Sequence, residues 1–118
     1  MTLGANSTID SSNNGNSTAG AVVNIASADG TAGNSYNLEI RSRNGQTTVT
    51  GAVQDIGTLT LHDNDANSTG NFDFQDTVTA TALATVGQNY DVAIDSGNNG
   101  TSTITDDVTF SNTGTVAL

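Results

Sequence analysis

The densest group of side chains that could carry out chemistry lies in the acidic stretch HDNDANSTGNFDFQD, residues 62–76. Asp63, Asp65 and Asn67 occupy the first, third and fifth positions of a loop that begins like an EF-hand. Hard oxygen ligands of this kind suit calcium, and Asp73 lies close enough in the chain to add another carboxylate. One hypothesis for the stretch is therefore a weak calcium site formed by Asp63, Asp65 and Asp73.

A solvated turn is the competing interpretation of the same stretch, and we favour it. The sixth position of the loop is Ser68 where an EF-hand needs glycine, and the twelfth is Phe74 where it needs a bidentate glutamate. In this interpretation Asp63 ends one strand and opens a turn in water, while Asp73 and Asp76 point outward from the next strand. No cofactor other than calcium is suggested by the sequence.

Paired carboxylates can act as the acid and base of a glycosidase, which makes Asp73 with Asp76 and Asp106 with Asp107 the candidates for catalysis. Neighbouring residues of a strand point to opposite faces, so Asp106 and Asp107 cannot face one substrate unless a bulge intervenes. His62 is the single histidine and has no cysteine with which to share a metal, so we expect a surface residue at a strand end. We expect no catalytic residues and no enzymatic activity.

The sequence is strongly acidic, with 12 Asp and Glu residues against 2 arginines and a formal net charge of −10. Such a surface repels polyanions, so we expect neither nucleic-acid binding nor attachment to anionic lipid. Arg41 and Arg43 alternate with Glu39, and we expect an exposed ion pair there, worth at most about 1 kcal/mol. The apolar runs are about three residues long, far short of the roughly twenty that a membrane span requires.

Alternation of apolar and polar residues predicts an all-β chain, because period two is typical of half-buried strands. The alternating segments are residues 36–42, 47–53, 57–63, 72–78, 90–95 and 102–110, with an Ala-rich strand also expected over 79–86. Turns are expected between them at the pairs Asn14-Gly15, Asp29-Gly30, Asn44-Gly45, Ser96-Gly97 and Asn99-Gly100, because such pairs reach positive φ at low cost.

Two short elements recur along the chain and indicate an internal repeat. An apolar-x-x-x-Val element begins at Val49, Phe74 and Ile104, and an apolar-x-apolar element begins at Leu38, Leu59 and Val92. Their alternation gives a period of roughly twenty to thirty residues, which is the length of one solenoid coil. Residues 1–118 are therefore expected to form a single repetitive β domain, one unit of a tandem array or filament, with any export signal on a longer parent chain.

Several phrases of the sequence, including NLEIRSRNGQTTVTGAVQDIGTLTLHDND, FDFQDTVTATAL and TITDDVTFSNTGTVAL, resemble the repeats of very large bacterial surface and exported proteins of the filamentous-haemagglutinin-like or adhesin-like type. The resemblance covers nearly the whole chain. It implies a right-handed parallel β-helix in an extracellular stalk or adhesin on a bacterial cell surface, without catalytic residues. The chain departs from the family pattern in its higher Asp content and its uneven coil lengths.

The fold predicted from these observations is a right-handed parallel β-helix, and an antiparallel β-sandwich adhesin repeat is the alternative. A β-helix without caps presents unpaired backbone groups at each end, so we expect the unit to associate end to end as a structural element. The alternative function is a binding module in which a Thr/Asn-rich face recognises glycan, a host or other cell surface, or ice. Its candidate Thr columns are Thr47, Thr48 and Thr50, and Thr58 and Thr60.

Overall fold

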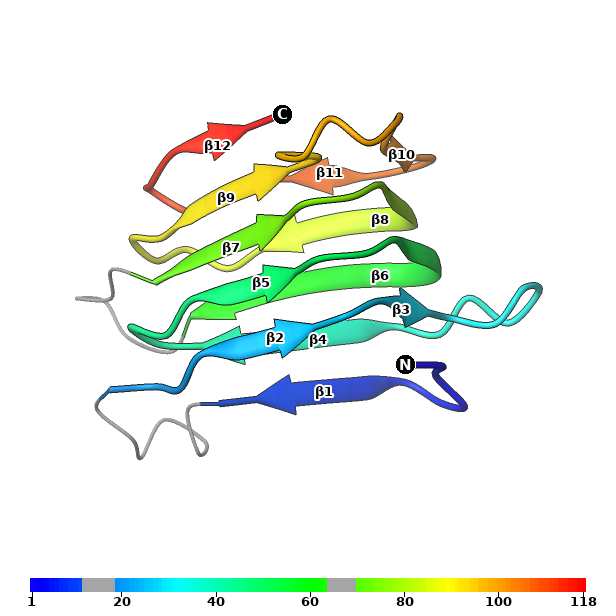
Figure 1. Cartoon of the computed structure of the whole chain (residues 1–118), viewed down its shortest axis with the longest axis horizontal. Helices are drawn as coiled ribbons and strands as arrows, with labels where there is room; N and C mark the ends of the chain where they lie inside the picture. The colour runs from blue at the N-terminus through cyan, green and yellow to red at the C-terminus, as the bar shows by residue number, and fades with distance from the viewer. Residues whose placement is uncertain (12–18, 64–69) are drawn as a thin grey trace.

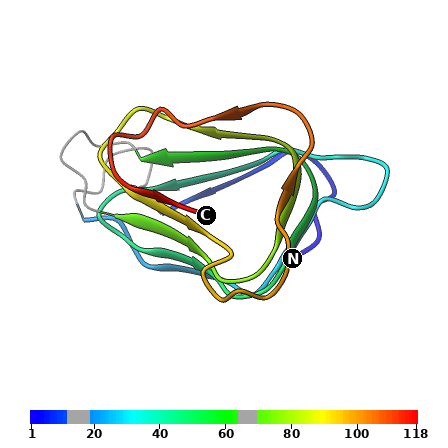
Figure 2. The ribbon, with the colours of Figure 1, turned by 90° about the horizontal axis from the view of Figure 1, so that it is seen from above.

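The computed structural model describes residues 1–11, 19–63 and 70–118. Within these ranges the chain is all-β, and every pairing between its strands is parallel. Figure 1 shows the strands stacked as successive coils, which form a β-solenoid of about 4 turns. Seen from the C-terminal end, the chain runs counter-clockwise as it rises toward the viewer, so the coil is right-handed (Figure 2). The predicted parallel β-helix is confirmed, and the parallel pairing excludes the antiparallel sandwich.

Each coil has three faces, which the view along the axis shows as a triangular outline (Figure 2). Sheet B forms one face and stacks β2 (Val23–Ile25), β5 (Thr47–Val49), β7 (Asn71–Phe74), β9 (Asp91–Ile94) and β12 (Val116–Ala117). Sheet A supplies the other two. Its long face stacks β1 (Ser7–Asp10), β4 (Leu38–Ser42), the ends of β6 (Val53–Asp63) and β8 (Val78–Thr85), and β11 (Val108–Thr109). Its short face stacks β3 (Ala28–Asp29), the starts of β6 and β8, and β10 (Thr103–Ile104).

Strand β6 serves two faces because it bends at a bulge. Its pairing with β8 shifts register between Val53 and Ile56, and Asp55, between them, has a φ of 54°. A bulge of this kind inserts an unpaired residue and turns the strand, which carries the chain from the short face to the long face. Alternating β-branched residues and leucines then continue the strand to Asp63, as the sequence predicted for residues 57–63.

The core is a set of vertical columns of apolar side chains inside the coil. On the long face, Leu38, Leu59 and Leu83 stand in register and are each at most 2% exposed. On sheet B, Phe72 lies between Thr47 and Val92, and its ring meets that of Tyr90 edge to face at 5.3 Å between centroids. Phe72, Phe74 and Tyr90 are buried, while Tyr36 and Phe110 pack against the core partly exposed, as expected for core positions and corners.

The registers confirm part of the predicted repeat and correct the rest. Leu38 pairs with Leu59, and Val49 pairs with Phe74, so the first two copies of each element are equivalent. The third copies are not. Val92 pairs with Phe72 on sheet B rather than continuing the Leu38 and Leu59 column, and Ile104 pairs with Ala80 rather than with Phe74 or its column. The error arises because the same apolar-x-apolar pattern also occurs on sheet B: the residue in register with Leu59 is Leu83, 24 residues further along, whereas Val92 belongs to another face.

The glycines at the corners have a different role from the one predicted. Gly30, Gly45 and Gly97 lie outside the left-handed region. They are needed because the neighbouring coil passes too close for a side chain: a β-carbon at Gly45 or Gly97 would lie 2.2 Å from the carbonyl oxygen of Ala21 or Gln75 respectively. Within the described ranges, positive φ is adopted instead by Gly20, Gly33, Thr31, Ser35, Asp55, Asp95 and Asn98. The Asn14-Gly15 pair lies outside those ranges.

Candidate functional site

The acidic stretch is only partly described. Asp63 is the last residue of β6, at one of the alternating positions whose side chains are buried, and it is 0% exposed. The solvated position that we favoured for it is therefore wrong. Asp73 lies on β7, where its carboxylate accepts hydrogen bonds from Ser96 Oγ at 2.5 Å and Gln75 Nε2 at 3.1 Å. Asp65 is outside the described residues, and no group of three or more potential metal ligands occurs among the residues that are described. The calcium hypothesis therefore stays a prediction.

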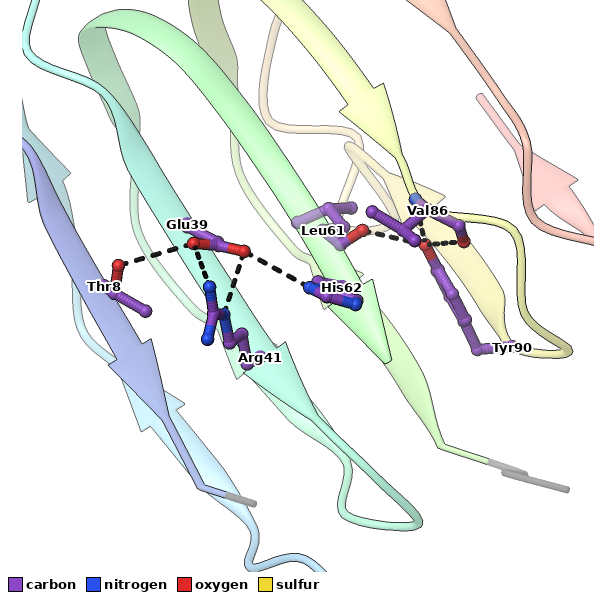
Figure 3. Close-up of polar contacts among 7 residues, drawn as sticks. All are labelled: Thr8, Glu39, Arg41, Leu61, His62, Val86 and Tyr90. Atoms are coloured by element: carbon purple, nitrogen blue, oxygen red, sulfur yellow. Dashed lines mark hydrogen bonds and ion pairs between the residues drawn. The ribbon is translucent and has the colours of Figure 1, made fainter. Parts of the chain in front are cut away.

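A charged cluster crosses three coils on the outer side of the long face (Figure 3). Glu39 on β4 accepts hydrogen bonds from Arg41 Nε at 2.9 Å and Arg41 Nη2 at 3.0 Å. Thr8 on β1 lies 3.4 Å from the same carboxylate, and His62 Nδ1 on β6 lies 3.3 Å from it. The Arg41 hydrogen bond is the main reason that the pKa of Glu39 is lowered, and Glu39 in turn raises the pKa of Arg41. The predicted ion pair is confirmed for Arg41, and the groups are exposed enough for it to contribute little to stability.

The other candidate carboxylates lie at different places on the coils. Asp106 and Asp107 are both exposed in the corner between β10 and β11 rather than on a strand. Asp76 also lies in a corner, where its side chain accepts a hydrogen bond from the Thr77 backbone N–H at 2.7 Å. Asp73 is held by Ser96 and Gln75, as described above.

The predicted threonine columns lie on different faces. Thr48 is on sheet B, in register with Asn24 and Asp73, whereas Thr60 is on the long face of sheet A, in register with Glu39 and Ala84. Thr47 is buried, and its hydroxyl has no hydrogen-bond partner among the residues that the structure describes. In the described strands, neither Thr48 nor Thr60 has a threonine in register beside it.

The C-terminal end of the coil stack carries an apolar opening. A cavity of about 350 Å³ lies there, lined chiefly by the apolar side chains of Leu83, Ile94, Ile104, Val108, Phe110 and Leu118. Figure 2 looks onto this end and shows that the last coil has no further coil above it. The sequence predicted uncapped ends in general, but the residues of this opening could be assigned only once the coil registers were known.

Exposure along one column shows why the opening exists. Leu59 is 0% exposed and Leu83, in register with it, is 2% exposed, but Val108, the next residue of the column, is 49% exposed. Leu118, at the end of the last pass over sheet B, is 88% exposed. Leu59 and Leu83 are covered by coils on both sides, whereas Val108 has a coil only on one side. The side chains of the last coil that point toward the core are therefore covered by another coil on one side only.

The last coil is nevertheless fixed to the coil below it. Thr85 Oγ1 accepts hydrogen bonds from the backbone N–H of Ser111 at 2.7 Å and of Asn112 at 3.1 Å. The Asn112 side chain donates to the carbonyl of Tyr90 at 3.0 Å, and Asp91 accepts from the Thr115 backbone N–H at 2.7 Å. These side chains take the place of ladder hydrogen bonds at the corners. The apolar opening is therefore held in a defined shape by specific contacts.

Backbone edges accompany the apolar opening. Strands β10 and β11 pair with β8, and β12 pairs with β9, in each case along one edge. At the other end, β1 pairs with β4 and β2 pairs with β5, again along one edge. Within the described chain no strand lies against the outer edges of these five strands. Such edges are templates for a further strand.

Comparisons with known proteins do not assign this chain: no protein-family model matches it, and no match was found among curated proteins or solved structures. The described residues include no helix long and apolar enough to cross a membrane.

Proposed function

We propose that the protein is a non-enzymatic structural unit that associates end to end through the open edges of its coil stack. The observation that carries the proposal is the position of exposed apolar side chains. In the described part of the chain, the large hydrophobic residues with substantial exposure are Met1 and Val22 in the first coil and Val108 and Leu118 in the last. All four belong to the first or the last coil, so we expect apolar contact between units at the ends of the stack.

Apolar surface and edge strands act together at these ends. Covering the C-terminal opening removes Val108 and Leu118 from water, and pairing of the edge strands satisfies backbone N–H and C=O groups at the same time. Patches of exposed apolar residues next to unpaired strands are typical of association sites. The result is a stiff rod whose length grows with each unit added, which suits a stalk or filament.

An extracellular setting on a bacterial surface is part of the same proposal. Its support is the resemblance of the repeats to those of large exported bacterial proteins, together with the β-solenoid architecture that the resemblance implies. In such a setting the unit would serve as a spacer in a stalk, filament or adhesin.

Negative-stain electron microscopy of the purified chain tests the proposal. At about 150 mM salt the Debye length is about 8 Å, so repulsion between copies of net charge −10 is screened. Thin filaments of uniform width are expected, and compact particles of a single unit would contradict the proposal. Imaging with and without a calcium chelator also tests the acidic stretch, because loss of filaments under chelator would support a calcium site that includes Asp63, Asp65 and Asp73.

A glycan-binding role is the second candidate, and one groove favours it. The groove has a volume of about 330 Å³ on the outer side of the long face and is lined mainly by polar residues, among them Asn6, Thr8, Asn37, Glu39 and Thr60. Hydroxyl, amide and carboxylate groups in one groove suit sugar hydroxyls. Binding to an immobilised glycan array that is lost in a Thr60→Val variant would support this role, whereas no binding by the wild-type chain would contradict it.

A further inference from the structure

We infer that the partner at the open C-terminal end is the N-terminal coil of a second copy, stacked head to tail and in register with the columns of the first. The inference rests on the proposed self-association and specifies its geometry. It distinguishes a continuing parallel β-helix from dimers in which two equal ends meet.

The register of the coils shows that the first and last coils match in cross-section. On the long face, Thr8, Glu39, Thr60, Ala84 and Thr109 occupy one outward-facing column, because each pairs with the next along β1, β4, β6, β8 and β11. On sheet B, Asn24, Thr48, Asp73, Ala93 and Ala117 form the corresponding column. The first and last coils therefore place strands at the same positions of the same cross-section. A second copy set above the first presents β1 to β11 and β2 to β12.

The order of the faces also argues for head-to-tail contact. In every coil the short face, the long face and sheet B follow one another in the same order along the chain. Head-to-tail stacking places every face on its own kind with parallel strands, as between all coils within the chain. In tail-to-tail contact the strands of the two copies run antiparallel, and the three faces follow one another in the opposite sense. At most one face of a copy can then lie on the same face of the other copy. Only the head-to-tail arrangement extends all the ladders at once.

Both ends of the stack carry apolar side chains that a head-to-tail contact would bring together. Val108 and Leu118 at one end face a first coil that carries the exposed side chains of Met1 and Val22, with Ile9 and Val23 partly buried beside them. Contact between unlike ends repeats without closing, so it generates a filament rather than a closed dimer. Contact between like ends stops at two copies.

Engineered disulfides test this arrangement, because the chain has no cysteine of its own. In the proposed stack Thr109 of one copy lies beside Thr8 of the next, at about the 4.8 Å spacing of paired strands, which is within the Cα separation that a disulfide bridges. Both side chains are exposed. Within one molecule the two residues are four coil spacings apart, roughly 19 Å, so an internal bridge cannot form.

The double variant Thr8→Cys/Thr109→Cys is expected to give a ladder of cross-linked dimers, trimers and larger species on non-reducing gels after mild oxidation. The pair Asn24→Cys/Ala117→Cys is expected to do the same on sheet B. The mixed pair Asn24→Cys/Thr109→Cys is the matched control, since its residues lie on different faces, and it is expected to give no ladder.

Single variants separate this inference from the proposed function. Cross-linked dimers from Thr109→Cys alone, with no ladder from the double variant, would show tail-to-tail contact and overturn the head-to-tail inference while leaving self-association intact. Dimers from Thr8→Cys alone would likewise show head-to-head contact. Wild-type chain that remains monomeric by sedimentation would overturn the proposed function itself.

Discussion

The middle coils and the last coil place the same kind of residue in the same column with opposite results. Leu59 is fully buried, and Val108, two coils further along its column, is about half exposed. Neither the residue type nor the strand geometry explains the difference, because both are apolar and both lie on parallel strands of the long face. Burial in this fold is supplied by the neighbouring coil. Core side chains in the middle of the stack are therefore buried within one molecule, whereas those at its ends are left partly exposed.

Alanine substitutions along that one column test the comparison with the largest expected effect. Leu59→Ala removes a fully buried side chain and is expected to lower the free energy of unfolding by about 2–5 kcal/mol. Val108→Ala is expected to lower it by less than about 1 kcal/mol, because the side chain is already half in water. Urea denaturation at low protein concentration measures both, and equal effects would contradict the assignment of a closed middle and an open end.

Close contacts between coils provide the next test. A β-carbon at Gly57 would lie 2.2 Å from the carbonyl oxygen of Ser35, whereas one at Gly4 would meet nothing within 4 Å. Gly57→Ala is expected to destabilise the chain by about 1–3 kcal/mol, because backbone must move apart. Gly4→Ala serves as the control and is expected to be neutral or slightly stabilising. Thermal unfolding followed by circular dichroism compares them, and a tolerated Gly57→Ala would argue against the coil spacing described here.

Tyr90 links two middle coils through its hydroxyl, and its ionisation makes the free energy of unfolding depend on pH in the alkaline range. The hydroxyl donates to the carbonyls of Leu61 at 2.8 Å or Val86 at 2.9 Å, and burial is the main cause that raises its pKa to about 12. The unfolded chain loses this proton near pH 10 and the folded chain only near 12, so the stabilisation present below pH 10 is lost as pH rises between those values.

The Tyr90→Phe variant tests that link. Removing the hydroxyl leaves buried backbone groups without this partner, and we expect a loss of about 1–3 kcal/mol at neutral pH. The variant should also lose the steep fall in stability between pH 10 and 12, which equilibrium unfolding at a series of pH values would show. An unchanged alkaline profile would mean that another group titrates in this range.

The smallest effect is expected on the outer surface. Glu39→Gln removes the charge that pairs with Arg41 while keeping the shape of the side chain. Because these groups are substantially exposed, we expect the free energy of unfolding to change by less than about 1 kcal/mol, and by less still at high salt. A loss as large as that of Leu59→Ala would show that the surface cluster, rather than the columns of the core, holds the middle coils together.

Local pattern predicted the strands well because alternation is a property of each segment. The segments at residues 36–42, 57–63 and 79–86 correspond to β4, the second part of β6 and β8. Local pattern did not assign Val92 to its face, because an apolar-x-apolar element looks the same on every face and only the coil length distinguishes them.

The candidate site shows the same limit. Glu39 and Arg41 are two residues apart on one strand, so their ion pair follows directly from the alternation of side chains. The opening lined by Leu83, Val108 and Leu118 joins residues from three separate passes of the chain. The opening exists only at the last coil of the stack, and the local sequence pattern does not show which coil is the last.

Sedimentation velocity over a range of protein concentrations tests the central claim most directly. The comparison uses the wild-type chain, Val108→Asp at the open end, and Thr79→Asp, which adds the same charge at an exposed position on the side of the solenoid. Circular dichroism first confirms that both variants keep the wild-type β signal. The account predicts that sedimentation coefficients rise with concentration for the wild type and Thr79→Asp but stay at the monomer value for Val108→Asp. A wild-type chain that remains monomeric throughout, or a Val108→Asp variant that assembles as well as Thr79→Asp, would contradict it.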